Sequence, residues 1–223
     1  LVTADDGFLH ALQVKDGLAV WSLPIGTEPV SPPVVDRGRI YLQTGLDQLL
    51  VIDLRDGSEI WSCDRYEDGG RPSQVTIFGH TAPTPVLLPK ADRSNAERLV
   101  LVGSSAGHLT AYNDDPAEGE CEVVWERKLG KSNEDFADVD AGPVVLDGIV
   151  YTAAYNSGVY ALRIADGRLV WKRPELRGVH RIAVDQHRVY IGARGRLAGL
   201  ERSQGKTLWK YRFEGGVPSQ PVV

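Results

Sequence analysis

The chain contains no methionine, only two cysteines and no long apolar run. A membrane-spanning helix needs about 18 or more consecutive apolar residues, so the sequence excludes one. The cysteines, Cys63 and Cys121, form no Cys-x-x-Cys pair, which argues against both a disulfide framework and a zinc site. Cys63 follows Trp61 by two residues and Cys121 precedes Trp125 by four, and these tryptophans occupy equivalent positions in two neighbouring units of a repeat described below. We therefore expect the two cysteines at different heights along their strands and both thiols unpaired.

An excess of basic charge is also missing. The chain has 25 Lys and Arg against 30 Asp and Glu, with a net charge of −5 and the two signs interspersed. This distribution lacks the basic footprint of a nucleic-acid-binding protein. With 223 residues, we expect one domain over 1–223.

Catalytic signatures are absent as well. There is no Gly-x-Ser-x-Gly elbow, His-Glu-x-x-His pair or Gly-rich phosphate loop, and the five histidines show no ligand-like spacing. The acidic run Glu134–Asp140 lacks the order of a calcium loop, which leaves turn capping or partner contact for its aspartates. We therefore predict no catalytic, cofactor-binding or metal-binding residues.

What the chain does contain is a cassette that recurs five times. A strand starts at or near a glycine, a polar turn with glycine follows, and a second strand carries a tryptophan. The copies are Gly7–Trp21, Gly45–Trp61, Gly107–Trp125, Gly158–Trp171 and Gly195–Trp209. A strand-only repeat with a period near 40 residues predicts an all-β fold, a β-propeller.

Two further strands lie between one tryptophan and the next cassette, as in Pro33–Val35 and Arg39–Leu42. Each blade is then a four-stranded antiparallel meander, A to D, with tryptophan on strand D. Three strands precede the end of the first blade, four blades follow, and Gln220–Val223 begins another. About five blades are thus present, either a closed ring or a window of a larger one; we favour the window, because natural sheets avoid open edges.

The spacing of the tryptophans locates two long insertions, Asp64–Ala82 and Glu126–Ala141. Both connect strand D to strand A at successive blade junctions, so they must lie side by side on one face. The first contains the apolar segment Val75–Phe78 and the second the pair Asp138 and Asp140. Exposed apolar residues in a loop indicate either a binding partner or burial in the blade junction.

The cassette resembles the pyrroloquinoline-quinone-type propeller repeat and, within it, the BamB family, lipoprotein subunits of the bacterial outer-membrane β-barrel assembly machinery. Two segments carry the closer resemblance, Asp138–Arg173 and Val75–Pro83, the second being similar to the family's Leu-Ser-Leu-Arg-Gly-Glu-Ser-Ala-Pro. The resemblance implies an eight-bladed ring, a periplasmic location and a lipid anchor outside this chain, which begins without methionine inside a predicted strand.

The resemblance also implies a protein partner, the BamA-like barrel-inserting subunit, bound through its periplasmic domains. The residues that match the family's contact positions are Val75, Ile77, Phe78, Asp138 and Asp140. Phe78 stands where the family has arginine, so no charged contact is expected there.

The sequence leaves two alternative functions open. One is a fragment of a quinone-dependent dehydrogenase, although the adjacent cysteines expected beneath its cofactor do not occur. The other is a generic propeller interaction module in a larger protein.

Overall fold

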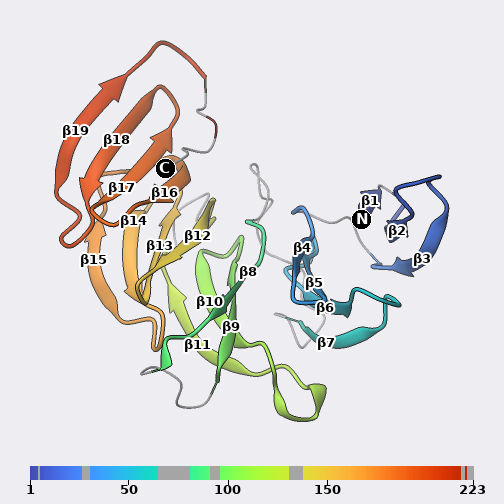
Figure 1. Cartoon of the computed structure of the whole chain (residues 1–223). Helices are drawn as coiled ribbons and strands as arrows, with labels where there is room; N and C mark the ends of the chain where they lie inside the picture. The colour runs from blue at the N-terminus through green and yellow to red at the C-terminus, as the bar shows by residue number, and fades with distance from the viewer. Residues whose placement is uncertain are drawn as a thin grey trace.

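Five antiparallel sheets follow one another around an arc in the computed structural model of the chain (Figure 1). The structure describes residues 1–4, 6–26, 31–64, 81–90, 96–130, 138–216 and 219. Within these ranges there is no α-helix, and so none that could cross a bilayer; a 3₁₀ turn, η2, spans Ala117–Gly119. The predicted all-β propeller of antiparallel blades is confirmed.

The strands pair in simple chain order within every sheet. The first sheet has three described strands and the other four sheets have four each. Their bounds are β1 (Val2–Ala4), β2 (Phe8–Leu12) and β3 (Ala19–Pro24); β4 (Val34–Asp36), β5 (Arg39–Gln43), β6 (Leu49–Asp53) and β7 (Glu59–Cys63); β8 (Thr84–Leu87), β9 (Arg98–Gly103), β10 (His108–Asn113) and β11 (Val123–Lys128); β12 (Ala141–Leu146), β13 (Ile149–Ala154), β14 (Gly158–Arg163) and β15 (Leu169–Arg173); β16 (Val179–Val184), β17 (Arg188–Ala193), β18 (Arg196–Glu201) and β19 (Thr207–Arg212). The predicted strand at Gln220–Val223 lies outside the described residues.

The hydrophobic core is divided among the junctions between successive sheets. One buried cluster joins β2 to β5 and β6, and the next joins β5, β6 and β7 to β9 and β10. Two larger clusters fill the remaining junctions. The three inner blades therefore have both faces covered by neighbours, which explains why their middle strands, such as β5, β6, β9 and β10, are buried at nearly every position.

The tryptophans connect successive sheets through hydrogen bonds and ring packing. In four of them the indole N–H donates to a backbone carbonyl in the third-to-fourth-strand turn of the following sheet: Trp21 to Leu54, Trp61 to Asp114, Trp125 to Ile164 and Trp171 to Arg202. At three of these junctions the turn glycine lies against the ring, because a Cβ at Gly57, Gly167 or Gly205 would come within 2.8 Å of the indole. Glycine in the repeated turn thus makes room for the previous blade's tryptophan.

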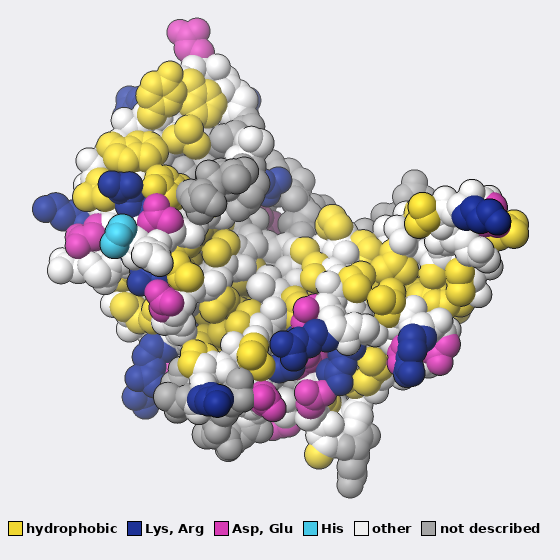
Figure 2. Space-filling view, viewed as in Figure 1, with side chains coloured by type: hydrophobic (Ala, Val, Ile, Leu, Met, Phe, Trp, Pro, Cys, Tyr) yellow, Lys and Arg dark blue, Asp and Glu magenta, His cyan; other side chains and the backbone are white. Residues whose placement is uncertain are grey.

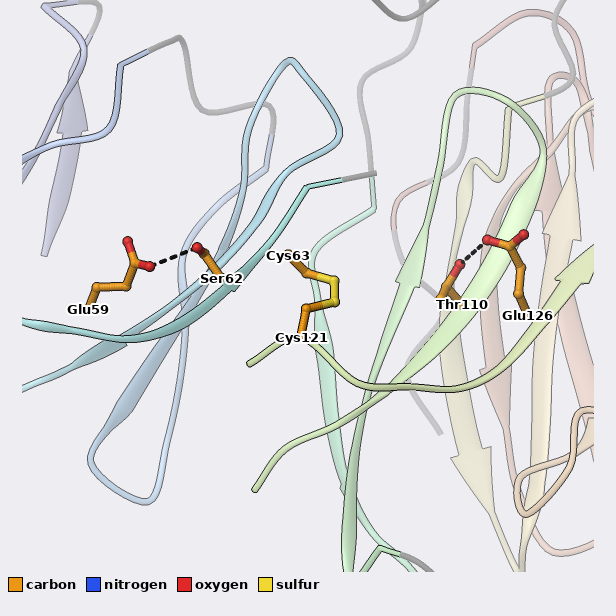
Figure 3. Close-up of a disulfide and its surroundings, with 6 residues drawn as sticks. All are labelled: Glu59, Ser62, Cys63, Thr110, Cys121 and Glu126. Carbon is orange, nitrogen blue, oxygen red and sulfur yellow. Dashed lines mark hydrogen bonds between the residues drawn. A yellow bond between two sulfur atoms is a disulfide. The ribbon is translucent and has the colours of Figure 1, made fainter. Parts of the chain in front are cut away.

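The cysteines are joined, which corrects the expectation of two unpaired thiols. Cys63 ends β7, and Cys121 lies in the connection before β11, with their Cα atoms 5.1 Å apart (Figure 3). That connection covers residues 114–122, whereas its equivalent between β6 and β7 covers 54–58. The longer connection carries η2 against β7, with Gly119 close to the Ile60 carbonyl. Cys121 therefore lies in a loop that folds back over the preceding blade and is not part of the tryptophan strand.

The face drawn in Figure 2 carries no large field of one sign among the described residues. In Figure 2 basic and acidic side chains alternate over the lower part of the arc, and a wide hollow separates the two ends, with hydrophobic side chains along the wall over the first two sheets. On the last strand, Trp209 is 42% and Tyr211 61% exposed.

Candidate partner-binding face

The connections between blades and the turns between second and third strands emerge on one face of the arc. The two predicted insertions belong to this face, but residues 65–80 and 131–137 lie outside the described part of the chain. The apolar residues Val75, Ile77 and Phe78 are among them. Their contact role therefore stays a prediction, while Asp138 and Asp140 can be placed.

Asp138 and Asp140 lie directly before β12, between the third and fourth blades, and are buried, with 3% and 7% of their surface exposed. Val139 fixes the segment between them: its N–H donates to the Ser104 carbonyl at 3.2 Å, and its side chain fills the space beside Gly103. The Asp138 carbonyl in turn accepts the Tyr155 N–H at 2.9 Å. The backbone of this segment thus joins the inner turns of two successive blades.

The carboxylates of both aspartates lack hydrogen-bond donors. None of their four oxygens accepts a hydrogen bond from another described residue. Burial and the charge of Asp47 raise the pKa of Asp138 to about 6. Burial and the charge of Asp138 raise the pKa of Asp140 to about 7, against an opposing effect of Arg181. Burying an ionised carboxylate without donors is unfavourable, so both carboxyls keep their protons to a higher pH than an exposed aspartate does.

Two neighbours complete this acidic group. Asp47, in the turn between β5 and β6, accepts hydrogen bonds from Gln43 at 3.3 Å and from Ser105 at 2.8 Å, which ties the second blade to the third. His180 on β16 places Nδ1 3.5 Å from Asp140. Burial and Arg181 lower the pKa of His180 below its usual 6.5, so near neutral pH this contact joins a neutral imidazole to a half-protonated carboxyl.

A groove of about 560 Å³ runs beside Asp140 on the inner side of the arc. The first strands of four blades line it, with Pro32, Thr81, Pro83, Pro143 and His180 among its walls. The Thr81 hydroxyl is buried without a hydrogen-bond partner in the described chain. The groove thus combines proline and valine side chains with polar ones, among them Asp140, Thr81 and Arg181.

Across the described ranges, no three His, Cys, Asp or Glu side chains converge as a metal-binding group. The predicted aspartates are brought together with Asp47 and His180, which the sequence did not single out. Only the repeat register, which aligns the inner turns of successive blades, could have indicated that contact.

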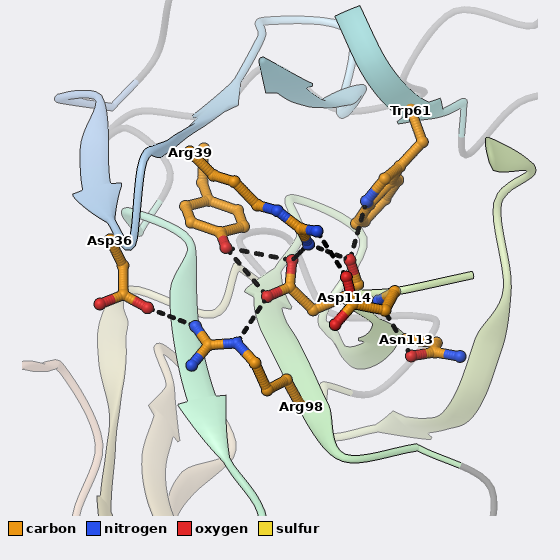
Figure 4. A network of polar contacts seen from close by, with 8 residues as sticks. Asp36, Arg39, Trp61, Arg98, Asn113 and Asp114 are labelled. Carbon is orange, nitrogen blue, oxygen red and sulfur yellow. Dashed lines mark hydrogen bonds and ion pairs between the residues drawn. The ribbon is translucent and has the colours of Figure 1, made fainter. Parts of the chain in front are cut away.

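On the opposite face, a charged network joins the second and third blades (Figure 4). Asp114 at the end of β10 has a fully buried side chain that accepts hydrogen bonds from Arg39 at 3.0 Å, Arg98 at 2.9 Å and the Tyr41 hydroxyl at 2.9 Å. Arg98 also pairs with Asp36. Burial and the Asp114 charge raise the pKa of Tyr41, which keeps its hydroxyl a donor.

Replacing Asp114 with Ala should lower the free energy of unfolding by about 3 kcal/mol, because two partly buried guanidinium groups lose their shared acceptor. The matched control is Asp115→Ala, since Asp115 is 58% exposed and pairs with Arg39 at the surface, where an ion pair contributes about 1 kcal/mol or less. Urea denaturation of both variants measures the difference. Equal losses would show that the network is not centred on Asp114.

Comparison with known proteins points to one family. The sequence model described as "Outer membrane protein assembly factor BamB" matches residues 1–222. The BamB of Yersinia pestis is 26% identical over 214 residues, which are 93% of this chain and 49% of the relative. The Escherichia coli BamB is 28% identical over 207 residues, 90% of this chain and 48% of the relative. The chain therefore spans about half the length of these relatives.

Solved structures share the fold. The crystal structure of BamB from Moraxella catarrhalis superposes with a TM-score of 0.71 at 20% identity, covering 94% of this chain and 60% of that one. A quinohemoprotein alcohol dehydrogenase from Pseudomonas putida superposes with a TM-score of 0.57 at 16% identity, over 82% of this chain and 34% of the enzyme. These likenesses establish the propeller architecture.

Proposed function

Because the chain belongs to the BamB family of outer-membrane protein assembly factors, we propose that it is a non-enzymatic periplasmic scaffold that binds a BamA-like barrel-inserting subunit. The observation that carries this proposal is the match of the family over residues 1–222, with relatives named as assembly factors across nine-tenths of the chain.

The partner-binding face supports the proposal geometrically. Both predicted contact segments belong to connections at successive blade junctions, so Val75, Ile77 and Phe78 are expected beside Asp138 and Asp140. The aspartates stay in the proposal as the acidic part of this face, although within the described chain each is more than nine-tenths buried. Because both side chains are buried, we propose that they shape the connection between the blades. A charge at the exposed edge of an interface would instead steer the approach of the partner.

The disulfide supports the proposed location. Disulfides persist in oxidising compartments such as the bacterial periplasm and are rare in the cytosol. Cys63 and Cys121, joined across a blade junction, fit a chain that folds in the periplasm. A lipid anchor outside this chain would hold it at the outer membrane, as the family resemblance implies.

The dehydrogenase alternative has weaker support. Its structural likeness shows only a common architecture, and the chain's two cysteines are 58 residues apart and bonded across two blades. They do not form the adjacent pair expected beneath a quinone. We propose that the full-length product binds no pyrroloquinoline quinone; stoichiometric quinone uptake, measured by absorbance after gel filtration, would contradict this.

The partner contact is tested by truncating the apolar loop. Ile77→Ala or Phe78→Ala should weaken binding of the periplasmic domains of the cognate BamA-like subunit by about 1–3 kcal/mol if either side chain is a buried anchor. Calorimetric titration gives the affinity, and circular dichroism checks the fold. Val14→Ala is the matched control, because Val14 is fully exposed in a turn on the opposite face.

Unchanged affinity in a folded Ile77→Ala/Asp140→Asn variant would show that the two connections only seal the blade junction. Absence of binding by the unmodified protein would contradict the proposed function itself.

A further inference from the structure

A basic pocket of about 380 Å³ opens in the last sheet, beside the groove described above. Four arginines line it together with one tyrosine and one histidine: Arg177, Arg194, Arg196, Arg212, Tyr155 and His180. Its volume falls within the usual range of ligand pockets, roughly 300–1,000 Å³.

The fold brings these arginines together from separate connections. Arg177 precedes β16, and Arg194 lies in the turn between β17 and β18. Arg196 begins β18, and Arg212 ends β19. All four positions are at the same ends of their strands as the connections between blades. The pocket therefore opens on the partner-binding face.

The arginines have no acidic counterpart in the described chain. No ion pair joins any of the four to a carboxylate there. Arg196 donates from Nη2 to the Arg177 carbonyl at 2.7 Å, but its Nε–H is buried with no acceptor among the described residues. A buried donor without an acceptor is unfavourable, and an incoming oxygen could satisfy it. In a chain of net charge −5, this is a local site for an anion.

The pocket and the proline-lined groove share one lining side chain. His180 lines both, and Arg181, whose side chain donates back to the His180 carbonyl, faces the groove. A free inorganic anion would use only the arginines. A peptide segment with carboxylates next to apolar side chains would use the arginines and the proline-lined groove together. Guanidinium groups are well suited to this role because they bind carboxylates in a planar, bidentate manner.

We propose that the pocket binds an acidic, partly apolar segment of a protein partner. This inference rests on the proposed function, because that function makes the occupant a protein. The pocket adds a basic contact in the last sheet to the apolar and acidic contacts predicted in the middle of the chain.

The test is a fluorescence anisotropy titration of the full chain with a labelled peptide that alternates Glu and Leu. The same peptide with Gln in place of Glu is the ligand control. The variant is Arg194→Gln/Arg212→Gln, because both side chains are exposed and neither side chain donates a hydrogen bond to another described residue. Arg55→Gln/Arg168→Gln removes the same charge from turns on the opposite face and is the protein control.

We expect the Glu peptide to bind more tightly than the Gln peptide, and the Arg194/Arg212 variant to weaken it about tenfold while the control double variant leaves it unchanged. Equal binding of both peptides, equal losses in both double variants, or displacement of the peptide by equimolar inorganic phosphate would overturn the proposal. The titration contains no barrel-inserting subunit. Its failure is therefore distinct from a failure of the Ile77 and Phe78 experiment.

Discussion

Replacing Cys63 and Cys121 with serine should lower the free energy of unfolding by about 4 kcal/mol. The bond closes a loop with a sequence separation of 58 residues, and removing it restores the chain entropy that the loop withholds from the unfolded state. Since the bond joins β7 to the connection before β11, the loss should fall on the junction between the second and third blades. Urea denaturation of the oxidised protein and the double variant measures the effect.

Two controls separate the bond from the side chains. Reduction of the unmodified protein with dithiothreitol should reproduce most of the loss, and the same reductant should leave the double serine variant unchanged. Intact-mass measurement under denaturing conditions should show the untreated protein two hydrogen masses lighter than the reduced one. Two free thiols in a thiol-labelling assay of the untreated, denatured protein would refute the disulfide.

The blade architecture could be predicted because each unit repeats the same pattern of strand, turn and tryptophan positions. The tryptophan on the fourth strand and the glycine in the following blade's turn recur together, as in Trp125 with Gly167, since one must accommodate the other. A strand that is poorly marked in one copy can therefore be assigned from its equivalents in the other copies. The assignment of three strands to the first sheet and four to each of the next four follows from this register and is confirmed.

The disulfide could not be predicted by the same reasoning, because it depends on where the repeat is broken. The sequence places Cys121 four residues before Trp125, which suggests a strand position. In the structure β11 begins only at Val123, and the extra residues of the preceding connection fold over β7. Loop direction is set by packing of η2 on the preceding blade, which no local pattern in one sequence encodes.

Of the candidate site, the sequence predicts the position of the two aspartates and not their environment. Spacing alone places Asp138 and Asp140 at a junction between blades, and the structure agrees. Their burial depends on Val139, which anchors the segment against Gly103, and on Asp47 and His180 from other blades. These contacts join turns that are distant in sequence. The sequence of one insertion alone therefore predicts a solvent-exposed acidic run.

The free energy of unfolding should fall by several kcal/mol as the pH rises from about 4 to about 8, because of Asp138 and Asp140. Both folded-state pKa values, about 6 and about 7, lie above the ordinary 3.8, so between these values the folded chain binds more protons than the unfolded chain. Their stabilising contribution is therefore complete at low pH and is lost as the pH rises through 6 and 7. A tenfold change in a proton dissociation constant corresponds to about 1.4 kcal/mol.

Asp138→Asn/Asp140→Asn removes both charges and should flatten this pH dependence, so that at pH 8 the variant is more stable than the unmodified protein by about 2 kcal/mol or more. The matched control is Asp185→Asn. Hydrogen bonds from the His187 N–H and the Tyr190 hydroxyl lower the pKa of Asp185, so this substitution should destabilise the protein near neutral pH and leave the slope between pH 5 and 8 unchanged. Urea denaturation across this pH range gives each slope. If the unmodified protein showed no slope, or the double variant kept it, the two carboxyls would be ionised in the folded chain, and charged aspartates on the proposed partner-binding face would then be the better description.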